Sequence, residues 1–165
     1  MISDLQLLEK HPFFRNINRE FLAQLSKFID HVSFKEDELI IQAGCQADKF
    51  YLITKGRVNI LTEKLDARKD TDTERVAIQT LGPGEILGWS WLIPPHKWHF
   101  DAKAVTPAEA IVLDGEYVRN QCEKDKNLGY ELLKRLTNFI IQRLTATRLQ
   151  LSIHSGKPFG DEEGH

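Results

Sequence analysis

The chain has 165 residues, of which 41% are hydrophobic and 28% charged, and its formal net charge is −2. This length suits one domain with a hydrophobic core, and the nearly balanced charge excludes the strongly basic surface typical of nucleic-acid-binding proteins. Cys45 and Cys122 are far apart and fit no metal or disulfide framework, which favours a reducing compartment. Without a signal-peptide pattern or a membrane-spanning apolar run, we expect a soluble, cytoplasmic protein.

Two short helices are predicted at the beginning of the chain. Ser3 precedes an acid and three leucines, which is the pattern of a capped helix that ends before Pro12. Asn18 is placed to cap the second helix. Between them, Phe13 and Phe14 are expected in the core. The apolar face predicted for the second helix holds Phe21, Leu22, Leu25, Phe28 and Ile29.

From Val32 the hydrophobic period changes to alternation, which predicts a series of short strands. The expected strands are 32–34, 39–41, 50–53, 57–61, 76–80, 102–105 and 110–113. We expect 50–53 and 57–61 to form a hairpin through Lys55-Gly56, and the polar segment 63–74 to be a solvated loop. Many short strands with turns between them predict an antiparallel barrel or jelly roll.

Helical patterning returns after Gly115, with a short helix and then a long one that begins near Asn127. The apolar stripe predicted for the long helix is Leu128, Leu132, Leu133, Leu136, Phe139, Ile140, Leu144 and Leu151. A helix that outruns its barrel often packs on a second copy, so we expect a homodimer through the 128–151 helix. Residues 156–165 are expected to be a disordered acidic tail, which leaves one domain at 1–155.

The stretch 82–92, with the sequence GPGEILGWSWL, organises the rest of the chain. Its three glycines permit tight turns and a close approach to a ligand. Glu85 lies among them with no obvious partner. Residues 88–92 predict a short helical turn that Pro94-Pro95 stops, and the free amides at a helix start favour an anion. The alternative is that this stretch is an irregular corner of the barrel.

The chain resembles the cyclic-nucleotide-binding domain of the Crp–Fnr superfamily. The matching segments are QAG at 42–44, DKFYLITKGRV at 48–58, GPGEILG at 82–88 and QRLTAT at 142–147. The resemblance implies a mainly β fold with flanking helices: an antiparallel double-stranded β-helix, or jelly roll, with N-terminal helices and a long C-terminal helix. It also implies a stand-alone regulatory or sensor module that binds cyclic AMP, cyclic GMP or another small anion and signals through the long helix to an unknown protein partner.

The phosphate-binding part of the resemblance is incomplete. In the family a Glu accepts the ribose 2′-hydroxyl, and an Arg followed by a small residue binds the cyclic phosphate through its bidentate fork. Glu85 matches that Glu, but Trp98 stands at the Arg position and His99 at the small residue. Lys97, one position earlier, offers only a point charge, and His99 binds phosphate only when protonated.

The remaining residues of the expected site come from the tryptophan-rich stretch and the long helix. Trp89, Trp91 and Trp98 can stack on a purine, or they can fill the barrel end and displace it. The resemblance places Thr147 against the base, with Arg148 beside it. The full set expected to bind the ligand is Gly84, Glu85, Ile86, Leu87, Gly88, Trp89, Ser90, Lys97, Trp98, His99, Thr147 and Arg148.

Two other functions stay open on the sequence. A ligand-free scaffold of the same fold would act through protein contact or dimerisation. A cupin-like metalloenzyme would need closely grouped ligands, for which His96, His99 and Glu85 are the candidates. We assign no catalytic residue and no metal site, and we expect no enzymatic activity. Without a helix-turn-helix after Leu151, and with no predicted membrane segment, DNA and membranes are not expected partners.

Overall fold

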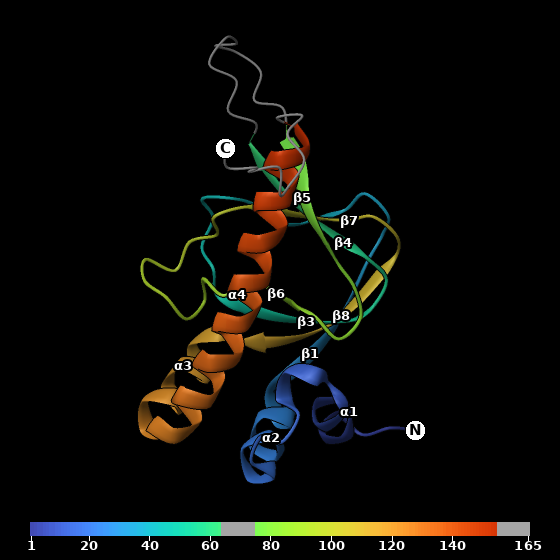
Figure 1. Cartoon of the computed structure of the whole chain (residues 1–165). Helices are drawn as coiled ribbons and strands as arrows, with labels where there is room; N and C mark the ends of the chain where they lie inside the picture. Colours follow the sequence, from blue (N-terminus) through green and yellow to red (C-terminus); the bar gives the residue numbers. More distant parts are fainter. Residues whose placement is uncertain (64–74, 155–165) are drawn as a thin grey trace, which may run out of the picture.

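The computed structural model describes residues 1–63 and 75–154, with the side chains of 147 and 150–154 outside the described part. Two four-stranded antiparallel sheets form a jelly roll, with short helices at one end and a long helix running along it (Figure 1). The expected fold class is therefore confirmed. Of the loop expected at 63–74, Glu63 belongs to a strand and 64–74 lie outside the described residues, as does the acidic tail. No helix within the described ranges has the length and hydropathy needed to cross a membrane.

The N-terminal helices follow the predicted caps. They are α1 (Asp4–Lys10), a 3-10 helix (Pro12–Phe14), α2 (Arg19–Leu25) and a second 3-10 helix (Ser26–Phe28). Ser3 forms a capping box with Gln6, and the Asn18 side chain accepts bonds from the first turn of α2. Phe28, expected on the apolar face of α2, instead lies beyond its end with 54% of its surface exposed, since α2 stops at Leu25.

Each sheet is built from strands that are distant in sequence. One sheet has the order β1 (Ile29–Phe34), β8 (Ala108–Asp114), β3 (Lys49–Lys55) and β6 (Ile86–Leu87). The other has the order β2 (Leu39–Ile41), β7 (Asp101–Ala104), β4 (Val58–Glu63) and β5 (Arg75–Leu81).

The predicted hairpin of residues 50–53 with 57–61 is wrong. β3 pairs with β8 and β6, whereas β4 pairs with β5 and β7, so the two strands belong to opposite sheets. The turn after β3 bonds instead to the β7–β8 connection: Arg57 N donates to Thr106 Oγ1 at 3.0 Å, and Val105 N donates to Arg57 O at 2.9 Å. Alternation predicts a strand but not its partner, so the glycine turn was assigned to the wrong connection.

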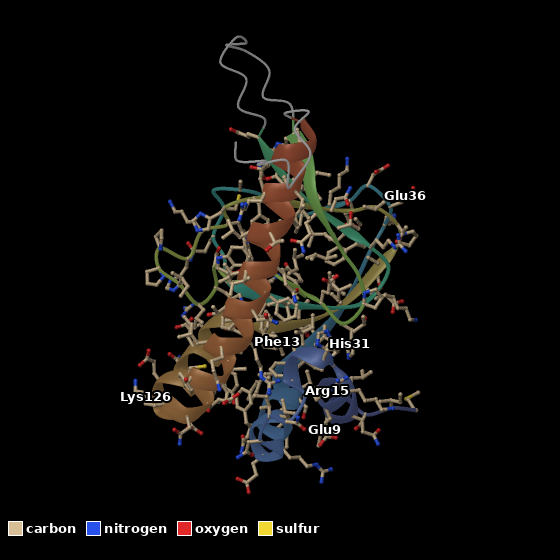
Figure 2. The ribbon with its side chains drawn as sticks, viewed as in Figure 1. Glu9, Phe13, Arg15, His31, Glu36 and Lys126 are labelled. Atoms are coloured by element: carbon tan, nitrogen blue, oxygen red, sulfur yellow. The ribbon has the colours of Figure 1, made fainter. Side chains whose placement is uncertain are left out.

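The helix α3 (Gly115–Lys124) leads into α4 (Lys126–His154), whose first half is fixed in the core. Leu132 and Leu136 are buried, and Arg135 Nη1 donates to Phe13 O at 2.6 Å. Figure 2 shows Phe13 between α4 and the N-terminal helices. The apolar stripe predicted for α4 included too many positions, because Leu133 and Leu144 are 47% and 63% exposed.

Candidate functional site

The backbone of the stretch 82–88 is held against strand β3. Gly84 N donates to Ile53 O, and Ile53 N donates to Glu85 O, both at 2.9 Å. The half-buried carboxylate of Glu85 accepts a bond from Gly82 N at 2.6 Å. Glu85 thus has a local partner that sequence inspection did not find, and this bond fixes the direction of its carboxylate.

Residues 88–92 form a turn rather than a helix. Leu92 N donates to Trp89 O at 3.0 Å, and the segment has no helical assignment. The sequence predicted an anion site at the free amides where a helix begins. No helix begins there, so that part of the prediction is wrong. A second turn over Pro94-Pro95 follows, in which His96 N donates to Ile93 O at 3.0 Å.

Two of the three tryptophans fill the end of the barrel. Trp91 is fully buried and stacks on Phe50 with ring centroids 4.5 Å apart. Trp98 is 6% exposed and lies so close to Gly88 that a Cβ added there would be 2.2 Å from its ring. Trp89 is only half-buried and forms one wall of the region described next.

Lys97 and His99, the charged residues expected near the phosphate, both lie at the surface. Lys97 is exposed, and its backbone forms an isolated bridge with Gln46. His99 is also exposed and lines a cavity of about 440 Å³ together with the ion pair of Arg75 and Asp101. The cation expected beside the phosphate is thus supplied by neither Lys97 nor His99 in this structure.

A different cation, Arg143 of α4, reaches this region from the helix. Only 8% of its surface is exposed. Its guanidinium carbon lies 4.5 Å from the ring centroid of Trp89 and 4.4 Å from that of Phe100. Its Nε donates to Gln79 Oε1 at 3.1 Å. Burial lowers the pKa of Arg143 to about 10, and the nearby Glu85 carboxylate opposes this shift.

We call the rings of Trp89 and Phe100 the aromatic corner, because their planes meet at 56° with centroids 5.6 Å apart. Sequence inspection missed Arg143 as part of this site. A signal was present, since position 143 continues the row of core-facing positions 128, 132, 136 and 139 at helical spacing. A basic residue on the core face of a helix needs a buried partner, which here is the aromatic corner.

The other expected site residues are divided between the core and the surface. Ile86 and Leu87 are buried in β6, and Gly84 lies in the preceding turn. The hydroxyl of Ser90 is buried, and no hydrogen-bond partner for it is found within residues 1–63 and 75–154. Arg148 is exposed on α4, and the side chain of Thr147 lies outside the described part.

Neither Glu85 nor Arg143 lines any of three surface cavities in the described part of the chain, of about 510, 440 and 350 Å³. Within the described ranges, no group of three or more His, Cys, Asp or Glu side chains is placed to hold a metal ion.

The chain belongs to the cyclic nucleotide-binding domain family, whose pattern matches residues 31–125. It is 28% identical to isozyme 1 of the cGMP-dependent protein kinase of Drosophila melanogaster over 80% of this chain and 17% of the kinase. It is 21% identical to a CRP-like cAMP-activated global transcriptional regulator of Mycobacterium tuberculosis over 79% of this chain and 56% of the regulator. The chain therefore spans only part of each of these relatives.

Solved structures agree on the fold. A candidate cyclic nucleotide-binding protein from Geobacter metallireducens superposes with a TM-score of 0.71 at 25% identity, covering 87% of this chain and 99% of the other. A cyclic nucleotide-binding domain from Methylobacillus flagellatus superposes with a TM-score of 0.66 at 21% identity, covering 96% and 84%. The fold thus occurs in these structures as a domain of similar length.

The residues present do not reproduce the family's contact to a cyclic phosphate. The resemblance implies an arginine where Trp98 is buried against Gly88. The acid of the family pattern, Glu85, is in place, and its charge acts on Arg143, a cation from a different element. A nucleotide can therefore bind only in a manner that differs at the phosphate end.

Proposed function

We propose that this domain is a regulatory module that recognises a small anionic ligand bearing a planar ring, with cyclic AMP and cyclic GMP as the first candidates. Membership of the cyclic nucleotide-binding domain family supports this ligand class. The observation that carries the proposal furthest is the contact of Arg143 with Trp89 and Phe100, because it joins α4 directly to the site. A ligand at the site therefore changes the contacts of the helix.

Two further features support a ligand at this place. The Ser90 hydroxyl is buried without a partner within the described ranges, which leaves a polar group that a ligand can satisfy. The carboxylate of Glu85 is only half-buried and can accept a second bond from a ligand hydroxyl. The ligand drives a change in α4 only if it binds two helix positions with different affinity.

Calorimetric titration with cyclic AMP and with cyclic GMP tests this function. We expect saturable heat with one nucleotide, and a rise in Tm of roughly 5 to 10 °C at a hundredfold excess over Kd. Glu85→Gln should weaken binding roughly tenfold, because a neutral amide oxygen accepts a weaker hydrogen bond than a carboxylate.

The matched control is Glu36→Gln, at an exposed position away from α4 (Figure 2). This control should bind as the unchanged protein does. Absence of both heat and thermal shift with either nucleotide at millimolar concentration would remove the nucleotide version of the proposal.

A second function, homodimerisation through α4, is favoured by a separate observation. Tyr130, Leu133, Ile141 and Leu144 are between 47% and 63% exposed. Their spacing of three, eight and three residues keeps them on one side of the helix, away from the buried Leu132 and Leu136. Such an exposed apolar row is typical of a helix that packs against a second copy.

Light scattering tests the dimer. Leu144→Asp places a charge in the apolar row, so we expect the mass to fall from that of a dimer to that of a monomer. The control is Asn138→Asp, which adds a charge at an exposed position outside the row. A monomer mass for the unchanged protein at high concentration would contradict this second function.

A further inference from the structure

Arg143 covers the aromatic surfaces that a planar ligand would use. The ring faces of Trp89 and Phe100 that meet at the aromatic corner are both within 4.5 Å of the guanidinium carbon. The guanidinium is itself a flat, delocalised group that stacks on aromatic rings. A planar ring that approached the same faces would therefore have to take the place of the guanidinium.

We propose that Arg143 is a built-in occupant of the ligand site, which a ligand must displace and whose displacement releases the second half of α4. The inference rests on the proposed function for the identity of the site, and it adds the way in which the site is regulated. In the ligand-free domain, α4 is therefore docked against β5 through the side chain of Arg143.

The environment of Arg143 suits an occupant better than a receptor for an anion. Its described partners include two aromatic rings, the amide of Gln79 and the negative field of Glu85. Rings attract the cation through their faces, Gln79 accepts a bond from Nε, and Glu85 supplies the opposite charge. A planar ring that replaced the guanidinium would take over its two ring contacts, while the anionic group of the ligand would have to lie away from Glu85, because like charges repel.

Arg143 is positioned to control the second half of α4. The first half is anchored by Leu132, Leu136 and the bond of Arg135 to Phe13 O. Beyond Arg143, the side chains of Leu144, Arg148 and Leu149 are exposed. Among the described side chains of α4, that of Arg143 is the last buried one, so its loss should loosen the exposed part that follows while the anchored part stays in place.

The experiment combines nucleotide titration with amide hydrogen exchange of the full chain. The variants are Arg143→Ala and Arg143→Met, the second of which keeps an unbranched apolar stem in the space and protects the fold. If the guanidinium competes with the ligand, both variants should bind cyclic AMP or cyclic GMP roughly tenfold more tightly than the unchanged protein. Without ligand, both should lose amide protection at residues 144–149.

The control is Gln142→Ala, at the exposed neighbouring position, which should change neither quantity. Weaker nucleotide binding by Arg143→Met would overturn the inference, because Arg143 would then be a receptor for the ligand. Unchanged exchange at 144–149 in both variants would overturn it as well. If exchange rises but no variant binds either nucleotide, the docked helix is supported and the proposed nucleotide function fails.

Discussion

The ring of Trp98 packs directly on the backbone of Gly88, and this contact closes the barrel end. Gly88 has φ +85°, and an added Cβ would lie 2.2 Å from the indole. Gly44 has nearly the same φ, +86°, but nothing lies within 4 Å of its added Cβ. The two glycines thus share a backbone conformation and differ only in packing.

Alanine substitution at both glycines separates packing from backbone strain. Gly44→Ala should cost about 1 kcal/mol of unfolding free energy from the positive φ alone. Gly88→Ala should cost about 3 kcal/mol, because the indole must also move. Urea unfolding followed by far-UV circular dichroism measures both. Equal losses would show that Trp98 yields without cost and that the barrel end is loosely packed.

His11 gives a pH dependence whose sign follows from its hydrogen bonds. The ring is 5% exposed, accepts a bond from Phe13 N at Nδ1, and therefore donates from Nε2 to Ile53 O. Burial lowers the pKa of His11 below its usual 6.5, against the raising effect of the Ile53 bond. Protonation would place a hydrogen on Nδ1 and break the bond from Phe13.

The folded protein consequently binds fewer protons at His11 than the unfolded chain just below pH 6.5. The stabilisation is complete above this value and is lost as the pH falls towards the lowered pKa. Unfolding free energies measured from pH 8 to 5 should show a steeper loss for the unchanged protein than for His11→Gln. His31→Gln, at an exposed histidine bonded to Asp4, is the control. Parallel curves for the unchanged protein and His11→Gln would exclude His11 as the source.

At the scale of elements, α4 has two apolar sides with different roles. Leu132 is fully buried, whereas the adjacent Leu133 is 47% exposed. Leu132→Ala should cost about 3 kcal/mol through lost burial and a cavity. Leu133→Ala should cost less than about 0.5 kcal/mol when measured at low protein concentration. Denaturant titration of the two variants checks the orientation of the helix, and the reverse order would mean that α4 is rotated.

The elements also show what the sequence could predict. The caps at Ser3 and Asn18 and the strands are local patterns, and the structure confirms them. The pairing of β3 was predicted wrongly because alternation carries no information about the partner strand. The place of Arg143 was missed because the whole fold sets the distance from residue 143 to Trp89. The family pattern, in addition, places the phosphate-binding cation at residues 97–99.

At the scale of the molecule, one hydrophobic cluster joins all parts of the described chain. Phe13 from the N-terminal segment packs against Phe50 of β3 and Phe139 of α4, with centroid distances of 5.1 and 5.9 Å. Within residues 1–63 and 75–154 the helices have no core of their own, so they should not unfold before the barrel. Scanning calorimetry should show one transition whose calorimetric and van't Hoff enthalpies agree. A calorimetric enthalpy well above the van't Hoff value would contradict this shared core.

The three tryptophans of the chain all belong to the segment 89–98, so its intrinsic ultraviolet emission reports on a single neighbourhood. Trp91 and Trp98 are buried, while the ring of Trp89 faces the guanidinium of Arg143. A cation over an indole alters the wavelength and yield of its emission. The protein thus contains its own fluorescent probe, and a shift in the emission of Trp89 can report movement of α4 without an attached dye.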